Sequence, residues 1–216
     1  MLCIDDNDGR SAATTGSSLR FGKGEAIYLQ GDPAGSWFEV IRGIVRTCRF
    51  HADGRRQLTG FFYSGDVFGV DEGAYRETAE AVTSAVVRRS PLSRAPAAPD
   101  VEGGPLRRAL QSAQDCIFLL GHRTAAERVS AFLLAIAERL PASERLLLPM
   151  SRGDIADHLG LTMHTVSRTI SDLARQQLIA IDSPHQIRIL DLVRLRALTG
   201  DAEDGIGGAG EDFQAA

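Results

Sequence analysis

The chain has 216 residues, which is long enough for one large domain or two smaller ones. Its content of 44% hydrophobic and 24% charged residues excludes wholesale disorder, and no apolar run approaches the roughly 18 residues that cross a bilayer. The acidic N-terminus, residues 1–10, lacks the basic and then apolar order of a signal peptide, so we expect a cytoplasmic protein with no membrane partner.

The net charge of −4 is unevenly distributed along the chain. Residues 1–150 carry 18 bases and 18 acids, and residues 151–200 carry six bases and five acids. The remaining residues carry five acids and no base, so we expect residues 201–216 to be an acidic disordered tail. A surplus of one base over residues 151–200 is a weak electrostatic indication of nucleic-acid binding.

From Leu19 to about Arg89 short apolar runs alternate with turn residues at spacings of about ten residues. The runs are Ala26 to Leu29, Trp37 to Ile41, Ile44-Val45, Thr47 to Phe50 and Gln57 to Phe62. Asp53-Gly54 between the last two runs predicts a hairpin, because this pair tolerates the positive φ of a tight turn. The rhythm predicts a small antiparallel barrel or sandwich. From Ser90 to Pro105 four prolines interrupt the pattern, and we expect a surface connection that is neither a long helix nor a central strand.

After Pro105 the hydrophobic period becomes helical, with a seam of apolar residues that step by four and three: Leu106, Leu110, Ala113, Ile117 and Leu120. Such a seam packs either on its own domain or on a second copy of the chain. Phe118 and Leu119 add apolar surface beside it, which favours self-association. A second helix is predicted from Thr124 to Leu140, with one apolar face formed by Val129, Phe132, Leu133 and Ile136.

The segment SRGDIADHLGLTMHTVSRTISDLA, residues 151–174, predicts a helix-turn-helix. A short helix from Asp154 to Leu159 packs inward through Ile155, Ala156 and Leu159, Gly160 makes the turn, and Leu161 fills the angle between the helices. Thr162 is a good N-cap for the next helix, whose buried face is Val166, Ile170 and Leu173. An ordinary helical hairpin with a solvated polar face would show the same pattern.

The opposite face of the second helix is polar, and an arginine there can bond bidentately to guanine. A hairpin after it, with alternation from Leu178 to Ile181, a turn at Ser183-Pro184-His185 and alternation from Gln186 to Leu190, predicts the wing of a winged helix. The order of helix, turn, helix and wing favours DNA binding. The candidate DNA-binding residues are Ser151, Arg152, Thr162, His164, Thr165, Ser167, Arg168, Ser171, Arg175 and His185.

The chain from about Phe21 to Leu198 resembles the CRP/FNR superfamily of bacterial transcription regulators, and within it the FixK-like branch. The matching segments are FGKGEAIYLQGDPA, FEVIRGIVRTCRFHADGRRQLTGFFYSGDVFG, AAERVSAFLL and PMSRGDIADHLGLTMHTVSR. The resemblance implies an α+β protein with an N-terminal antiparallel β-roll of the cyclic-nucleotide-binding type, a long dimerisation helix and a C-terminal winged helix-turn-helix. It also implies a homodimer that binds double-stranded DNA at a palindromic site and acts on bacterial RNA polymerase. We expect the following division: 1–18 disordered, 19–105 β-roll, 106–122 dimerisation helix, 123–200 winged helix and 201–216 tail.

The β-roll departs from the members that bind cyclic AMP. They carry a glutamate in a GDxxGE segment and an Arg-Ser pair that binds the phosphate, whereas this chain has Val70 in GDVFGVD and Glu77-Thr78. Arg76 is adjacent to that pair, and a register shifted by one residue would use it. A carboxylate facing a phosphate is repulsive, so we expect no response to cyclic AMP.

Other cofactors are also not expected. Oxygen-sensing members hold an iron–sulfur cluster with several N-terminal cysteines, and Cys3 alone cannot do so. Cys48 or His51 would be the residues for haem, but a cysteine in a strand is more often an inert packing residue. FixK-like regulators are thought to act without a cofactor.

The predicted reading helix departs as well. Related regulators have Glu-x-x-Ser-Arg, and here the sequence is His164-Thr165-Val166-Ser167-Arg168. Ser167 and Arg168 carry over. The half-site resembles TTGA in the family. One base pair of it is undetermined here, because the family's glutamate would accept a hydrogen bond from cytosine N4 and a histidine bonds differently.

Two other classes of function are weighed against this interpretation. An enzyme is disfavoured because the five histidines are scattered and the chain has no phosphate loop, nucleophile elbow or paired carboxylates at a strand end. An effector-gated or redox-gated regulator of the same family would share the DNA chemistry and add a ligand in the β-roll.

Overall fold

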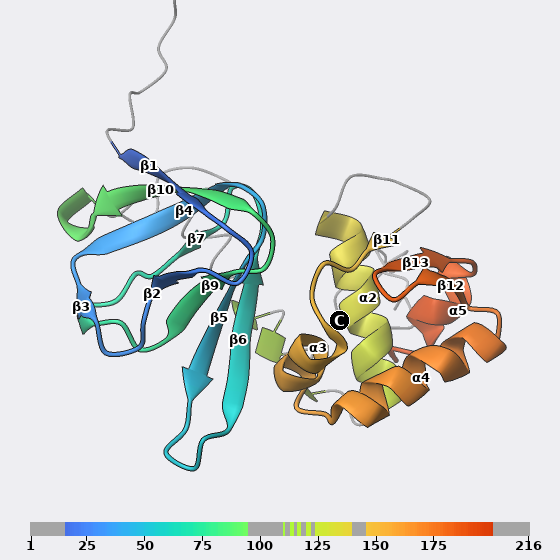
Figure 1. Ribbon diagram of the computed structural model, residues 1–216. Coiled ribbons are helices and arrows are strands. Elements are labelled where there is room, and N and C mark those ends of the chain that lie inside the picture. The colour runs from blue at the N-terminus through green and yellow to red at the C-terminus, as the bar shows by residue number, and fades with distance from the viewer. Residues whose placement is uncertain are drawn as a thin grey trace, which may run out of the picture. The chain divides into compact units, whose positions relative to one another are not determined.

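The computed structural model describes residues 16–94, 110, 113–114, 116–117, 120–121, 124–139 and 146–200 (Figure 1). The chain divides into two compact units, one of Met1–Thr47 with Phe61–Leu110 and the other of Cys48–Gly60 with Gln111–Ala216. Residues 1–15, the tail 201–216, Cys3, Leu106 and the greater part of the expected surface connection lie outside the described residues. The expectation of disorder is wrong for Ser17 and Ser18, which begin a strand.

The β-roll is built from short strands, as the alternation of apolar runs and turns predicted. They are β1 (Ser17–Phe21), β2 (Ala26–Tyr28), β3 (Pro33–Ala34), β4 (Ser36–Arg42), β5 (Val45–Phe50), β6 (Arg56–Phe62), β7 (Val67–Phe68), β8 (Gly73–Ala74), β9 (Thr78–Ala81) and β10 (Ala85–Pro91). The described strands form a sheet of order β1-β10-β4-β7, a sheet of order β2-β9-β5-β6 and the small pair β3-β8. The predicted fold class is confirmed.

The interior of the roll is filled by aromatic side chains. The rings of Tyr28 and Tyr75 stack with their centroids 3.8 Å apart, and the rings of Phe38 and Phe68 stack at 5.4 Å. All four side chains are buried, and Val40, Val45 and Val87 belong to the same core. The described core of the roll is therefore occupied by the protein's own side chains.

The predicted hairpin at Asp53-Gly54 is confirmed. Strands β5 and β6 are neighbours in one sheet, and Gly54 has a φ of 82°, a conformation that glycine adopts without steric cost. The amide of His51 donates to the carbonyl of Arg55 at 2.9 Å and closes the turn.

The expectation for Ser90 and Pro91 is wrong, because β10 continues through both residues. Ser90 pairs with Trp37 and Pro91 with Ser36 of β4. Among the described strands, β1 pairs with β10 only as far as Arg89. At Pro91, which has no amide hydrogen to donate, β10 therefore has one neighbouring strand, β4. Proline is tolerated at such a strand end. A 3₁₀ turn, η1 (Leu92–Arg94), follows.

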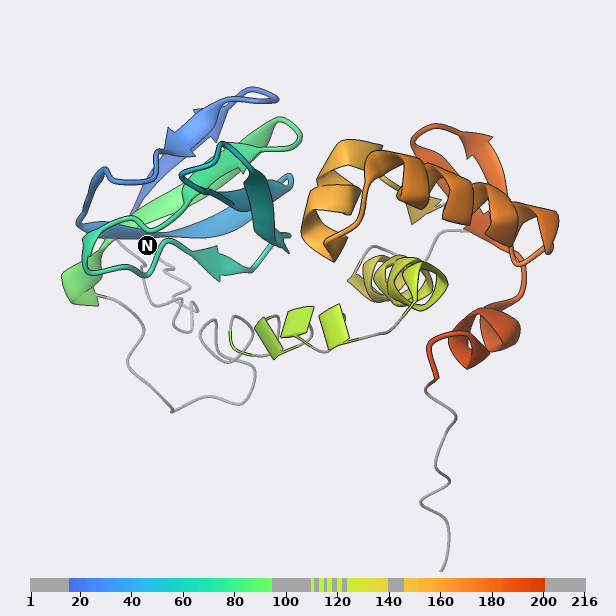
Figure 2. The same ribbon diagram turned by 90° about the horizontal axis from the view of Figure 1, so that it is seen from below.

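In the second unit, helices α2 (Ala125–Arg139), α3 (Arg152–Leu159) and α4 (Met163–Arg175) pack with a small sheet and with α5 (Leu192–Ala197). Figure 2 shows α4 lying across α2. The sheet has the order β11-β13-β12, from Leu146–Leu147, Gln186–Ile189 and Ile179–Ser183. The predicted wing hairpin is β12 with β13, whereas β11 was not predicted.

The described residues of the predicted seam, Leu110, Ala113, Ile117 and Leu120, are helical. The side chains of Leu110 and Ile117 are 61% and 72% exposed in the single chain. No helix within the described residues is both long enough and apolar enough to span a membrane.

Candidate nucleic-acid interface

Helix α3 begins at a reciprocal capping box. The hydroxyl of Ser151 accepts from the amide of Asp154 at 3.0 Å, and the carboxylate of Asp154 accepts from the amide of Ser151 at 3.1 Å. This arrangement satisfies two backbone donors that the first turn of a helix leaves without partners. The helix ends at Gly160, whose φ of 63° and ψ of 38° place it in the left-handed region.

The turn between α3 and α4 is held from outside as well. The guanidinium of Arg128 on α2 donates to the carbonyl of Leu159 at 3.0 Å, one residue before the turn. Thr162 then caps α4 by accepting from the amide of Thr165 at 3.1 Å, as predicted. These contacts fix where α4 begins relative to α3.

Helix α4 separates an apolar face from a polar one. Val166, Ile170 and Leu173 are buried, as predicted, and Thr169 is buried beside them. The side chains on the other side are exposed: His164, Ser167, Arg168, Ser171 and Arg175. The structure therefore brings these five predicted residues together on one open surface, which we call the α4 polar face.

Two residues of the α4 polar face have contacts within the helix. The hydroxyl of Ser171 donates to the carbonyl of Ser167 at 3.0 Å, and Arg175 forms an ion pair with Asp172. Both pairs are exposed, so their hydrogen bonds exchange readily with water or with a bound polar group.

Of the remaining predicted site residues, Ser151, Thr162 and His185 are exposed, and Arg152 and Thr165 are half-buried. Thr162 and Thr165 share a contact between their hydroxyls at 2.8 Å, and the hydroxyl of Ser151 is used in the capping box. Arg152 is half-buried, and burial lowers the pKa of its guanidinium below the ordinary value. In the wing turn, Nδ1 of His185 lies 2.9 Å from the carbonyl oxygen of Leu148.

Some residues of this surface were not predicted from the sequence. Met163, the first residue of α4, is exposed beside His164, and helical periodicity could have indicated it. Arg188 on β13 forms an ion pair with Asp182 on β12 at 2.9 Å, which links the two strands of the wing. The sequence signal for Arg188 was its position next to Ile187, because neighbouring residues of a strand point to opposite faces.

The part of the β-roll where cyclic-nucleotide-binding proteins would hold a phosphate is rich in carboxylates. Val70 is exposed and Glu77 is half-buried, while the hydroxyl of Thr78 accepts from the amide of Gln30 at 3.0 Å. Arg76 is exposed and its guanidinium pairs with Asp71 at 3.0 Å. Burial raises the pKa of Tyr28 above its usual range, and the charges of Glu77 and Asp71 raise it further.

Comparison with known proteins gives matches to both units. Residues 18–94 match the cyclic nucleotide-binding domain family, and residues 127–198 match the Crp-like helix-turn-helix domain family. The chain is 38% identical to the nitrogen fixation regulation protein FixK of Bradyrhizobium diazoefficiens, over 90% of this chain and 87% of that protein. It is 40% identical to the transcriptional activatory protein AadR of Rhodopseudomonas palustris, over 83% of this chain and 80% of that protein.

A solved structure is similar over nearly its whole length. FixK2 from Bradyrhizobium japonicum superposes with a TM-score of 0.76 at 37% identity, covering 87% of this chain and 99% of that chain. The fold and the matched regulators define the present protein as a DNA-binding transcription regulator and not as an enzyme. The chain belongs to the CRP/FNR family, and its FixK-like character is confirmed.

Proposed function

We propose that the protein binds a palindromic, TTGA-like DNA site as a homodimer and activates transcription without cyclic AMP or an iron–sulfur cluster. The observation that carries the proposal is the α4 polar face, because it places hydrogen-bonding side chains on the open side of a helix whose other side is anchored in the core. In a helix-turn-helix this is the helix that enters the major groove.

Within the α4 polar face, Arg168 is the proposed base reader and Ser167 assists it. The Arg168 side chain is exposed and lies on the opposite side of α4 from Ile170, so it can extend into a groove without disturbing the core. A guanidinium in that position can bond to O6 and N7 of guanine. Ser151, Arg152, Thr162, Thr165 and His185 are proposed as flanking contacts, chiefly to phosphates.

The homodimer is supported by Leu110 and Ile117, two apolar residues of the predicted seam that are helical and exposed in the single chain. In dimers of helix-turn-helix proteins the two reading helices contact half-sites about one turn of DNA apart, which matches a palindromic site. Activation through bacterial RNA polymerase is proposed from the relatives, one of which is named a transcriptional activatory protein.

Independence from cofactors is supported by the roll and by the cysteines. Aromatic rings fill the roll, and the carboxylates of Glu77 and Asp71 would repel a phosphate. The chain has three cysteines, fewer than the four thiolates that hold a typical iron–sulfur cluster. The competing function, an effector-gated or redox-gated regulator, would require a ligand or an oxidation that changes the affinity for DNA.

The test is selection of binding sites from random double-stranded DNA by the wild-type protein, by Arg168→Ala and by His164→Glu. We expect the wild type to select an inverted repeat, and Arg168→Ala to bind it with about 1–3 kcal/mol less free energy and relaxed preference at one base pair. His164→Glu should shift the preference toward the TTGA half-site, because a carboxylate accepts from cytosine N4.

Two results would contradict the assignment. If Arg168→Ala loses affinity equally on every sequence and keeps the wild-type motif, Arg168 contacts phosphate only. If the wild-type protein selects no motif, the proposed reading helix is wrong.

A further inference from the structure

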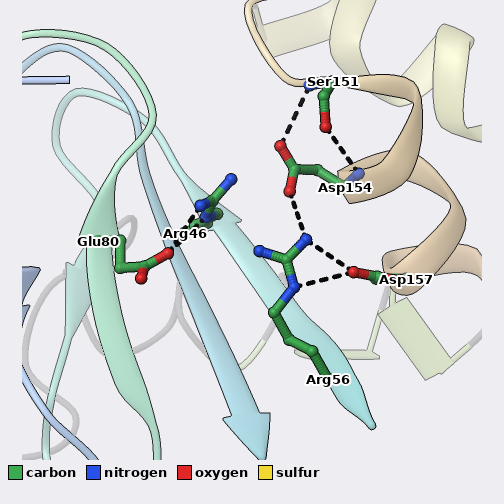
Figure 3. Close-up of polar contacts among 6 residues, drawn as sticks. All are labelled: Arg46, Arg56, Glu80, Ser151, Asp154 and Asp157. Carbon is green, nitrogen blue, oxygen red and sulfur yellow. Dashed lines mark hydrogen bonds and ion pairs between the residues drawn. The ribbon is translucent and has the colours of Figure 1, made fainter. Parts of the chain in front are cut away.

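Arg56, the first residue of β6, contacts two carboxylates of α3 (Figure 3). Its Nε and Nη2 donate to Oδ2 of Asp157 at 2.9 and 2.7 Å, and Nη2 also donates to Oδ1 of Asp154 at 2.8 Å. All three residues belong to the second compact unit, so the contact lies within that unit. We call this arrangement the Arg56 clamp.

Asp154 takes part in both the Arg56 clamp and the capping box. Figure 3 shows its carboxylate between the backbone of Ser151 and the guanidinium of Arg56. One carboxylate oxygen accepts from the amide of Ser151 and the other accepts from Arg56. The guanidinium is therefore linked to the N-terminus of α3 through a single side chain.

The same hairpin segment, residues 48–60, has further contacts within the second unit. The backbone of Leu58 hydrogen-bonds the buried His158 of α3, and the carbonyl of Thr59 lies 3.8 Å from the sulfur of Cys116. Asp154 lies in the first turn of α3, and Asp157 and His158 lie near its end. The hairpin thus contacts this helix along more than one turn.

The charges of the Arg56 clamp are partly withdrawn from water. The side chain of Asp154 is 6% exposed, and a buried carboxylate without a cation is strongly destabilising. Burial acts to lower the pKa of Arg56, but its hydrogen bonds to Asp157 and Asp154, together with the charges of these carboxylates, outweigh burial and raise that pKa, so the guanidinium stays charged. A charged partner that donates to two carboxylates of one helix restricts the orientation of α3 more than an exposed ion pair does.

We propose that Arg56 is a positioning residue for DNA recognition, which holds α3 through Asp154 and Asp157 and thereby fixes the angle at which α4 presents its polar face. The inference rests on the proposed function, since it takes α4 as the reading helix. Helix α3 reaches α4 through the tight turn at Gly160, and the two helices pack directly against each other, so a rotation of α3 moves α4. Base readout tolerates such a shift far less than phosphate contact does.

The test measures the affinity of the full chain for two duplexes, one with the motif that the wild type selects and one of scrambled sequence. We expect Arg56→Gln to raise Kd about tenfold on the selected duplex and less than about twofold on the scrambled one. The matched control is Arg55→Gln, which removes the same charge one residue away. The Arg55 side chain is 78% exposed and pairs with Asp53, and we expect both Kd values to change less than about twofold.

A charge exchange separates positioning from a general effect of charge. Arg56→Asp and Asp157→Arg should each lower the affinity for the selected duplex. The double variant, which keeps the net charge of the wild type, should recover it to within about threefold. Thermal unfolding followed by circular dichroism shows whether each variant is folded. If Arg56→Gln does not fold, Asp157→Asn replaces it, because this variant leaves the capping box intact. We expect it to raise Kd about threefold on the selected duplex, with the same selectivity over the scrambled one.

Two outcomes would overturn the proposal. One is an equal loss by Arg56→Gln, or by Asp157→Asn in its place, on the selected and the scrambled duplex. The other is a double variant, Arg56→Asp with Asp157→Arg, whose affinity for the selected duplex is no higher than the two single losses added together predict. Failure of the proposed function is a different result, because then the wild type selects no motif or Arg168→Ala leaves the motif unchanged.

Discussion

His158 is a histidine held in the interior of the DNA-binding unit, where its charged form is disfavoured. The ring lies 5.8 Å from that of Phe132, and burial lowers the pKa of His158 to about 4. The unfolded chain would bind a proton near the usual pKa of about 6.5, so between these two pKa values the unfolded state holds more protons than the folded state. The stability contributed by the neutral ring is complete above the unfolded pKa and is lost as the pH falls toward the folded one.

We therefore expect the free energy of unfolding to fall by about 2 kcal/mol between about pH 7 and about pH 5 through this residue alone. Urea unfolding of the wild type and of His158→Gln at both pH values measures it. The glutamine variant is less stable at both, but its pH dependence should be smaller by that amount. An unchanged pH dependence would show that the pKa of His158 is the same in the folded and the unfolded chain.

Single residues of the helix-turn-helix were predictable because their roles depend on nearby sequence. Thr162 caps a helix that starts at the next residue, and Gly160 is the left-handed turn residue that its position between two helical patterns indicated. The contact of Arg56 with Asp154 and Asp157 spans about a hundred residues of chain, and no local pattern indicates it. Long-range polar contacts of this kind depend on the packed structure.

At the scale of elements, strands with their own turn signals were predicted and strands without them were not. The hairpin of β5 and β6 has Asp53-Gly54 at its tip, whereas β11 is two residues long and becomes a strand only by pairing with β13. The end of β10 shows the opposite case. Pro91 suggests that the strand breaks there, but a proline at an edge position does not end a strand. Elements that depend on a distant partner are thus the ones that sequence patterns miss.

The aromatic core of the β-roll leads to a prediction about cyclic AMP. Tyr28, Phe38, Phe68 and Tyr75 stack within the roll, and Glu77 and Asp71 add negative charge at its rim. We expect a titration of labelled operator DNA with the protein to give the same midpoint with and without the nucleotide. Arg168→Ala, titrated in parallel, confirms that the assay reports specific binding. A tenfold shift, about 1.4 kcal/mol of coupling, would show that the roll binds the nucleotide after all.

At the scale of the whole molecule, the boundary between compact units does not coincide with the boundary between sequence patterns. The expected division assigned all of residues 19–105 to the roll, yet residues 48–60 pack in the unit that carries the helix-turn-helix. Strand β6 begins at Arg56 of the clamp and ends at Phe62, whose ring lies 5.4 Å from that of Phe68 in the aromatic core. Strand β6 thus contains both the first residue of the clamp and a residue that packs against the aromatic core.

The predicted homodimer is tested by placing a charge in its seam. Ile117 is 72% exposed in the single chain and would be buried against a second copy, so Ile117→Asp would bring two unpaired carboxylates together at the two-fold axis. We expect this variant to sediment as a monomer at micromolar concentration, while the wild type sediments as a dimer. The matched control is Gln114→Asp, which adds the same charge to the same helix away from the seam and should remain dimeric. A dimeric Ile117→Asp variant would show that the two-fold contact lies elsewhere, and monomers from both variants would show only that the helix tolerates no added charge.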